Sequence, residues 1–275
     1  MDYALIADVH GNVEALDAVL TAITRAAPSA RLVCAGDLVG YGPDPEACID
    51  RLRGHDAVCV IGNHDQMVLG RRGFERANHA GIRAARWTRD RLSTDALDYL
   101  ATLPATADLP GGLFVCHGTP WDADLYIDGA AMAGKALAAL EEMAPTARVL
   151  VCGHTHHAAI HLPDEGFRRP PPPRAALPGE ATAIVNPGAV GQSRDGQPLA
   201  RYALLDTTAG TVRFGACAYD VPTTLRKLRR VGLVPRVDAP PPHGWRGRLG
   251  RYRTRWARWR TRPPPPFSRS GRRSC

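Results

Sequence analysis

No apolar run in this chain approaches the roughly 18–20 residues that are needed to span a bilayer. The start also lacks the positively charged segment and the small-residue cleavage site of a secretory signal. We therefore expect a cytoplasmic protein with no transmembrane segment. At 275 residues and 44% hydrophobic composition the chain can bury a sizeable core, which excludes a fibrous or wholly disordered protein.

Paired cysteine motifs are missing as well. The seven cysteines are odd in number, widely spaced and mostly set in apolar runs, as at Cys34 and Cys152. This pattern favours buried structural thiols in a reducing compartment over a disulfide framework or a zinc knuckle.

Acidic residues are scarce in the last part of the chain. Residues 222–275 hold 16 lysines and arginines against the single acid Asp238, whereas residues 1–221 hold 19 basic and 26 acidic side chains. The net charge of +8 is therefore a property of the tail. Its proline runs oppose helix and sheet. We expect a domain over residues 1–221 and a basic Pro/Arg-rich tail over 222–275, with a helix over Val221–Val231 and disorder beyond.

One stretch of this tail, Arg251–Arg260, interleaves cations with aromatic residues. Such segments pair with phosphates and stack on bases, so nucleic acid is one candidate partner. An anionic membrane would attract the same stretch. An Arg- and Pro-rich extension without a function explains the composition equally well.

The body of the chain opens with apolar runs that alternate with helical patterns. Leu5–Ala7, Leu32–Ala35 and Ala57–Ile61 are predicted strands, and they are separated by predicted helices over Asn12–Arg25 and Pro45–Leu52. This order is typical of the βαβαβ start of an α/β domain.

The later segments follow a different pattern. Residues 66–103 are predicted to be helical, and an Ala-rich helix around 132–143 separates two further strands, Leu113–Cys116 and Val149–Cys152. The Pro-rich segment 163–178 is predicted to be a mobile surface loop. Four short β runs favour antiparallel strands packed on the first sheet: Ala158–Leu162, Thr182–Val185, Arg201–Leu205 and Thr211–Ala216.

Short polar motifs follow five of the apolar runs. Open α/β sheets place their ligand sites at the carboxyl ends of strands, so the five segments are expected to converge on one edge. Oxygen and imidazole donors without paired thiolates suit divalent ions such as Mn, Fe, Co, Ni or Zn. The motifs therefore predict a two-metal hydrolytic site. They are Asp8-Val9-His10, Gly36-Asp37, Gly62-Asn63-His64-Asp65, Cys116-His117-Gly118 and Gly153-His154-Thr155-His156.

In this order the motifs resemble those of the calcineurin-like metallophosphoesterases, and in particular the small bacterial phosphodiesterases, over residues 1–221. The resemblance implies an α/β fold, a four-layer α/β/β/α sandwich of two mixed β-sheets flanked by helices. It also implies two divalent metal ions, with manganese as the first choice and Fe, Ni, Co or Zn as the others. The first ion would be held by Asp8, His10 and His156, the second by Asn63, His117 and His154, and Asp37 would bridge both.

The resemblance places His64 over the metals as the general acid, with Asp65 as the group that orients it. A hydroxide bridging the metals would attack phosphorus, and His64, with an unperturbed pKa near 6.5, would protonate the leaving group. The expected activity is hydrolysis of small phosphoesters or nucleotides, as a phosphodiesterase or phosphatase. An alternative for Asp8 and Asp37 is simple N-capping of helices, which the loop after Asp37 weakens.

The substrate is narrowed by the residues after Asp37. Gly40-Tyr41-Gly42 departs from the D-R-G form of phosphoprotein phosphatases and symmetrical dinucleoside tetraphosphatases, which disfavours both activities. Tyr41, His79 and Arg194 are candidate substrate-binding residues, although a solvated Arg194 in a turn is an equal alternative.

Two other functions stay open. One is a nuclease or RNA-associated phosphoesterase recruited through the basic tail. The other is a non-catalytic scaffold on the same fold, as in a retromer subunit that resembles this family. The intact set of candidate ligands and His64 argues against the scaffold.

Overall fold

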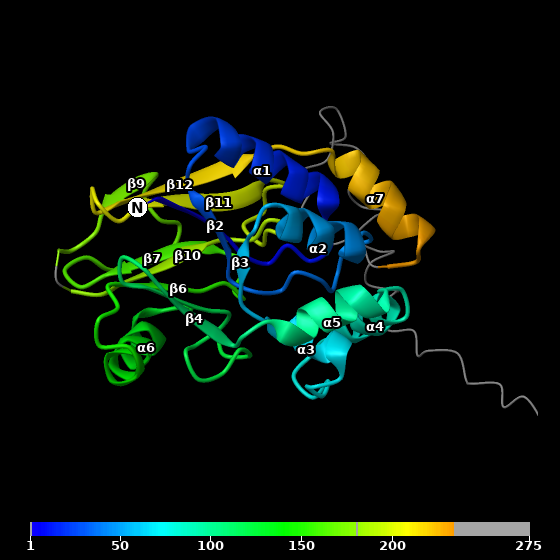
Figure 1. The fold of residues 1–275 in the computed structure, drawn as a ribbon, viewed down its shortest axis with the longest axis horizontal. Helices are drawn as coiled ribbons and strands as arrows, with labels where there is room; N and C mark the ends of the chain where they lie inside the picture. Colours follow the sequence, from blue (N-terminus) through cyan, green and yellow to red (C-terminus); the bar gives the residue numbers. More distant parts are fainter. Residues whose placement is uncertain (1, 180, 234–275) are drawn as a thin grey trace, which may run out of the picture. The chain divides into compact units, whose positions relative to one another are not determined.

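The computed structural model describes residues 2–179 and 181–233, which form two six-stranded mixed sheets flanked by helices (Figure 1). The first sheet has the order β3 (Val58–Cys59), β2 (Arg31–Cys34), β1 (Asp2–Ile6), β11 (Ala200–Asp206), β12 (Thr211–Cys217) and β9 (Arg174–Ala176). The second has the order β4 (Thr106–Leu109), β5 (Leu113–Cys116), β6 (Val149–Val151), β10 (Ala183–Pro187), β7 (Ala158–Leu162) and β8 (Gly166–Arg168). The helices are α1 (Val13–Ala26), α2 (Pro45–Gly54), α3 (Asn63–Leu69), α4 (His79–Arg89), α5 (Thr94–Thr102), α6 (Ala130–Met143) and α7 (Val221–Arg230).

The alternation of side chains along the central strands builds the layers. In β1, Ala4 and Ile6 enter the apolar core beneath α1 and α2. Tyr3 and Leu5, on the opposite face of the same strand, enter the core between the two sheets. β5 divides its side chains in the same way between the intersheet core and the core beneath α6. The predicted four-layer α/β/β/α sandwich is therefore confirmed, with α1 over the first sheet and α6 against the second (Figure 1).

The strands that precede the polar motifs run parallel. β1 pairs with β2 and β2 with β3, as the βαβαβ pattern predicts. In the second sheet β6 is parallel to both β5 and β10. Their carboxyl ends therefore lie at a common edge of each sheet.

The prediction for the second half of the chain is confirmed in its antiparallel pairs but wrong in packing all four β runs onto the first sheet. β11 and β12 do not form a separate antiparallel layer, because β11 joins β1 and so extends the first sheet. β10 lies between β6 and β7 in the second sheet, parallel to the former and antiparallel to the latter. Alternation of apolar residues identifies a strand but carries no information about a partner nearly 200 residues away.

The Pro-rich segment 163–178 is more regular than predicted. It contains β8 and β9, which form the outer strands of the second and first sheets. Pro170–Pro173 falls between these two strands, where the missing backbone donors remove no ladder hydrogen bond.

The predicted helical segment 66–103 is confirmed as helix but is divided into three. Gly70 ends α3 in the left-handed conformation that favours glycine, with φ of 69°. Ser93 begins a new helix, α5, by accepting a hydrogen bond from the amide of Ala96. β4 was not anticipated, and its side chains are only partly buried, which weakens the apolar pattern.

The thiols agree with their predicted structural role. Among the described residues all the cysteines are free, with Cys217 half-buried and the others buried. Burial raises the pKa of the Cys48 thiol well above its usual value, which keeps it protonated and unreactive.

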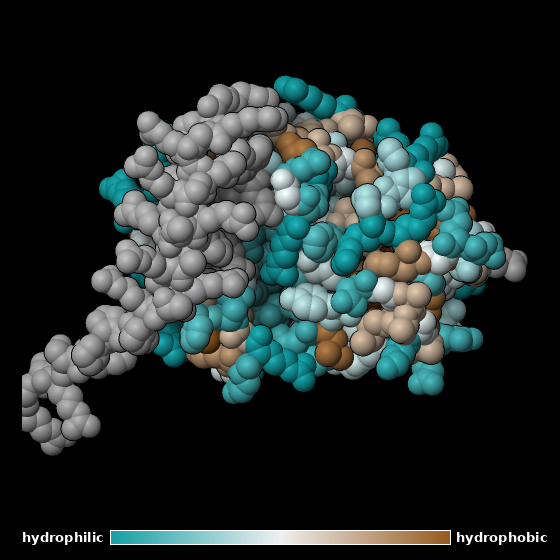
Figure 2. All heavy atoms as spheres, turned by 180° about the vertical axis from the view of Figure 1, so that it is seen from behind, coloured by the Kyte–Doolittle hydropathy of each residue, from teal (hydrophilic) through white to brown (hydrophobic). Residues whose placement is uncertain are grey.

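No helix in the described part of the chain combines the length and the apolarity that a bilayer crossing requires. On the uncovered part of the face in Figure 2, hydrophobic residues are scattered among hydrophilic ones. Most of the expected basic tail, with its proline runs and Arg251–Arg260, lies outside the described residues.

Helix α7 packs onto the domain through polar and apolar contacts. The Thr224 hydroxyl donates to the Glu14 carboxylate at 2.9 Å, and the Lys227 ammonium donates to Asp44 at 2.9 Å. Leu228 is buried in a small apolar cluster that includes Tyr41. The helix expected at the start of the tail is thus part of the folded body.

Replacing this apolar anchor tests that packing. We expect Leu228→Ala to lower the free energy of unfolding by about 2–5 kcal/mol, because it removes buried methyl groups and leaves a cavity. Arg229→Ala, on the exposed side of the same helix, should change it by less than about 0.5 kcal/mol. Urea denaturation measures both, and equal values would show that α7 contributes no packing energy.

Candidate metal centre

The predicted motifs meet at the carboxyl ends of the parallel strands, across the seam between the two sheets. Hydrogen bonds join the loops directly. The backbone amide of His154 donates to Asp8 Oδ1 at 3.1 Å, and His117 Nδ1 lies 2.7 Å from the carbonyl oxygen of Ala35. Asp8 and His10 follow β1, Asp37 follows β2, Asn63 and His64 follow β3, His117 follows β5, and His154 and His156 follow β6.

The backbone is unusual at the candidate ligands. Six non-glycine residues in the described part of the chain have positive φ, and five of them are Asp8, His10, Asp37, His154 and His156. Left-handed backbone costs a residue with a β-carbon about 1–2 kcal/mol. Such conformations persist where the surrounding structure fixes them, and they cluster at functional sites.

One group of donor atoms comes from the β1, β2 and β6 loops. His10 Nε2 lies 3.0 Å from His156 Nε2, 3.5 Å from Asp37 Oδ2 and 4.0 Å from Asp8 Oδ1. His10 Nδ1 faces the carbonyl of Val39, and His156 Nδ1 faces that of Gln192. A carbonyl accepts only from N–H, so both Nε2 atoms present lone pairs to each other. A cation between them would turn this repulsion into coordination.

A second group shares Asp37 with the first. His117 Nε2 lies 3.3 Å from Asp37 Oδ2 and 3.1 Å from Asn63 Oδ1. Asp37, His117 and His154 each offer an atom within 4.8 Å of the others. The His154 ring is held by a hydrogen bond to the backbone of Asp124.

The carboxylates fit metal ions better than they fit the protein alone. Asp8 and Asp37 are fully buried, and the Oδ2 atom of each has no hydrogen-bond partner among the described residues. A buried carboxylate oxygen without a partner is costly. Two divalent ions, one at each donor group and both at Asp37, would satisfy these atoms.

The pKa values of these groups also reflect the burial of the two carboxylates. Burial raises the pKa of Asp8 to about 7 and lowers the pKa of His10 to about 3. Burial also acts to raise the pKa of Asp37, but the positive charges of His117 and His64 hold it well below its usual value. Burial disfavours the charged form of His117, yet Asp37 raises the pKa of His117 to about 9. Without added cations, charge is concentrated in the Asp37–His117 pair.

His64 sits beside the first group. Its backbone amide donates to Asp37 Oδ1 at 2.9 Å, and its ring packs 4.5 Å from Tyr41 and 4.9 Å from His10 between ring centres. Its Nδ1 is buried without a hydrogen-bond partner among the described residues. Burial lowers the pKa of His64.

The Asp65 carboxylate is hydrogen-bonded to backbone amides rather than to the His64 ring that it was expected to orient. Its carboxylate accepts hydrogen bonds from the backbone amides of Leu38, Val39 and Gly62 at 2.9–3.3 Å. These bonds occupy the carboxylate and fasten the loop after Asp37 to the start of α3.

The three candidate substrate-binding residues differ in their positions. Tyr41 is only 8% exposed and packs against His10 and His64, so it supports the site from within. His79 is exposed at the first turn of α4. Arg194 is half-buried, and its charge acts on His64.

Sequence reasoning missed two residues of the loop network around His154. The Tyr126 ring stacks on the His154 ring, with centres 4.2 Å apart. Arg72 donates to the carboxylates of Asp122 and Asp124 at 2.6 Å each, in the loop that fixes the His154 ring. Neither residue belongs to a recognisable motif. For Tyr126 the one available signal was an aromatic residue soon after His117.

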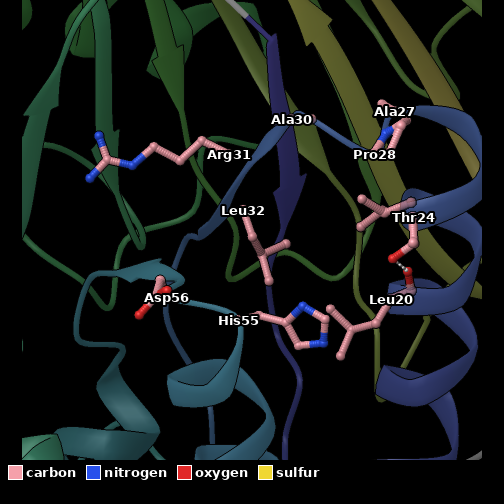
Figure 3. A pocket seen from close by; sticks show the side chains of 10 residues that line it. Leu20, Thr24, Ala27, Pro28, Ala30, Arg31, Leu32, His55 and Asp56 are labelled. Atoms are coloured by element: carbon pink, nitrogen blue, oxygen red, sulfur yellow. Dashed lines mark hydrogen bonds between the residues drawn. The ribbon is translucent and has the colours of Figure 1, made fainter.

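Two hollows differ in their relation to this centre. One of about 250 Å³ reaches Asn63 and is lined by Arg72, Arg76 and Asp122. Another of about 350 Å³ lies between α1, β2 and the turn at His55 (Figure 3). Its lining includes Arg31 at the amino end of β2, and Asp37 follows the opposite end of that strand.

Comparison with known proteins agrees with the fold. A protein of Methanocaldococcus jannaschii, described as uncharacterized, is 28% identical over 235 residues, covering 82% of this chain and 90% of that protein. A metallophosphoesterase from Sphaerobacter thermophilus superposes with a TM-score of 0.72 at 33% identity, covering 85% of this chain and 95% of that one. A hypothetical protein from Pyrococcus horikoshii OT3 shares the fold, with a TM-score of 0.70 at 18% identity and coverage of 86% and 96%.

The sequence profile of the calcineurin-like phosphoesterase superfamily domain matches residues 1–210. This match spans every predicted motif and every strand of the two sheets except β12. The chain therefore belongs to the calcineurin-like phosphoesterase superfamily.

Proposed function

We propose that this protein hydrolyses small phosphoesters or nucleotides, as a phosphodiesterase or phosphatase, with the help of two divalent metal ions. The observation that carries the proposal is the pair of donor groups that share the buried Asp37, whose Oδ2 has no hydrogen-bond partner among the described residues. Family membership supports the reaction class.

Each ion has a defined set of donors in this proposal. Asp8, His10 and His156 hold the first, Asn63, His117 and His154 hold the second, and Asp37 contacts both. The Nδ1–carbonyl contacts of His10, His117 and His156 support these assignments, because they leave Nε2 to face the ions. Manganese is the first choice, and the N and O donors also admit Fe, Co, Ni or Zn. When bound, the ions supply charge neutralisation at the phosphoryl oxygens and lower the pKa of water.

His64 is the proposed general acid. Its imidazole lies beside the first donor group and has an unpartnered buried nitrogen. Burial lowers its pKa, whereas the negative charge of Asp37 acts to raise it. A phosphoester bound against the ring adds a further negative charge and favours the protonated form that donates to the leaving oxygen. Asp65 contributes indirectly, by fixing the loop that carries Asp37.

Hydrolysis of bis-p-nitrophenyl phosphate with added Mn²⁺ tests the reaction. We expect His64→Ala to lower kcat by at least about 100-fold, since general acid catalysis contributes roughly 10²–10⁴. Asp37→Asn should also lower kcat strongly, because it removes the carboxylate charge that both ions share. His55→Ala, an exposed histidine beside the other hollow, is the matched control and should be unchanged.

The alternatives have distinct outcomes in this assay. A wild-type protein that is inactive with Mn, Fe, Co, Ni and Zn would point to the non-catalytic scaffold. Full activity in His64→Ala would remove His64 from the reaction while leaving the metal-dependent hydrolase in place.

Equilibrium dialysis with Mn²⁺ tests the metal centre without turnover. We expect two ions per wild-type chain, and fewer in Asp37→Asn because that carboxylate serves both donor groups. Thermal unfolding should show the same linkage, with about 2.7 kcal/mol of stabilisation for each bound ion at an ion concentration 100 times its Kd. Asp98→Asn, at an exposed position in α5, is the control. A single ion per wild-type chain would contradict the shared site.

A further inference from the structure

An exposed aromatic surface lies directly above one of the candidate ligands. Tyr126, between β5 and α6, stacks on His154 with ring centres 4.2 Å apart and 21° between the ring planes. Its side chain is nevertheless 42% exposed. Because His154 covers one face, the exposed area must lie on the outer face and the ring edge. A flat apolar platform therefore borders the metal centre.

The platform is linked to a cation from another loop. Arg194, in the segment between β10 and β11, directs its Nη1 to the Tyr126 hydroxyl at 3.5 Å. Its backbone amide donates to the carbonyl of His156 at 3.3 Å, which keeps the residue at the centre.

These positions match the two parts of an aromatic phosphoester. A planar group gains stacking energy on a tyrosine face, as bases do on aromatic side chains. A guanidinium is well suited to phosphate oxygens. Tyr126 offers the first and Arg194 the second, side by side at the edge of the metal centre.

We propose that Tyr126 and Arg194 form a substrate subsite, in which a planar aromatic substituent stacks on the outer face of Tyr126 while Arg194 contacts the phosphate. This subsite rests on the proposed function and narrows its substrate class to phosphoesters that carry a planar ring, as aryl or nucleoside esters do. Tyr126 sets the preference among phosphoesters, whereas Arg194 serves the phosphate that all of them share.

Calorimetric titration of the Mn²⁺-loaded protein with three phosphate monoesters tests this division. We expect the wild type to bind phenyl phosphate and adenosine 5′-monophosphate more tightly than glycerol 3-phosphate. Tyr126→Leu should weaken both ring-bearing ligands by about 5- to 100-fold, the range of base–aromatic stacking, and leave glycerol 3-phosphate unchanged. Tyr126→Phe should retain the preference, since it keeps the ring. Arg194→Met should weaken all three ligands alike.

The matched control is Trp121→Leu, an equally exposed aromatic residue, 47% accessible, in the same loop, which should bind all three as the wild type does. Comparing adenosine 5′-monophosphate with phenyl phosphate then distinguishes a nucleoside from a simple aryl group as the preferred ring.

The negative outcomes are separable. If Tyr126→Leu weakens glycerol 3-phosphate as much as the other ligands, Tyr126 acts by holding His154 and the subsite is overturned. Unchanged affinities in Tyr126→Leu overturn it too. Either result can occur while bis-p-nitrophenyl phosphate is still hydrolysed. Loss of all metal-dependent hydrolysis in the wild type would instead reject the proposed function.

Discussion

The carboxylate of Asp37 is the point at which the two sheets, the loops and the candidate ligands meet. It is fully buried, Oδ1 accepts from the His64 amide, and Oδ2 faces His10 on one side and His117 on the other. A buried charge in this position requires positive partners. His117 from the second sheet supplies one within the chain, and two cations would supply the rest. This requirement explains why the seam between the sheets is polar while the core behind it is apolar.

The fold meets this requirement through backbone geometry. Five candidate ligands adopt left-handed φ, which costs free energy at each position and is fixed by hydrogen bonds between neighbouring loops. The Asp65 carboxylate holds the loop after Asp37, and a methyl group at Gly62 would lie 2.0 Å from Asp37 Oδ1. Strands bring the loops to one edge, but these tight contacts decide where each donor atom points.

The convergence of the candidate ligands could be predicted from the sequence, but the contacts that hold their loops could not. Asp8, His10 and His156 follow apolar strands, so their convergence could be inferred from the α/β pattern alone. The hydrogen bonds of Asp65 could not be inferred in this way, because its partners are backbone amides, which no residue pattern identifies. Tyr126 depends on the path of the loop after His117 in the same way. The central strands were likewise recognisable as apolar runs, whereas β4, β8 and β9 were not. The pairing of β11 with β1 is set by long-range packing.

The loops around the metal centre contribute side chains that lie outside the packed core, unlike the strands beneath it. Arg72, Tyr126 and Arg194 come from three separate connections, and each is tied to the metal centre through one ligand residue: Arg72 and Tyr126 through His154, and Arg194 through His156. Loops vary at little cost to the core, because they lie outside the four packed layers. The sheets therefore hold the candidate donors that follow their strands, whereas a loop residue such as Tyr126 can be replaced without moving a strand.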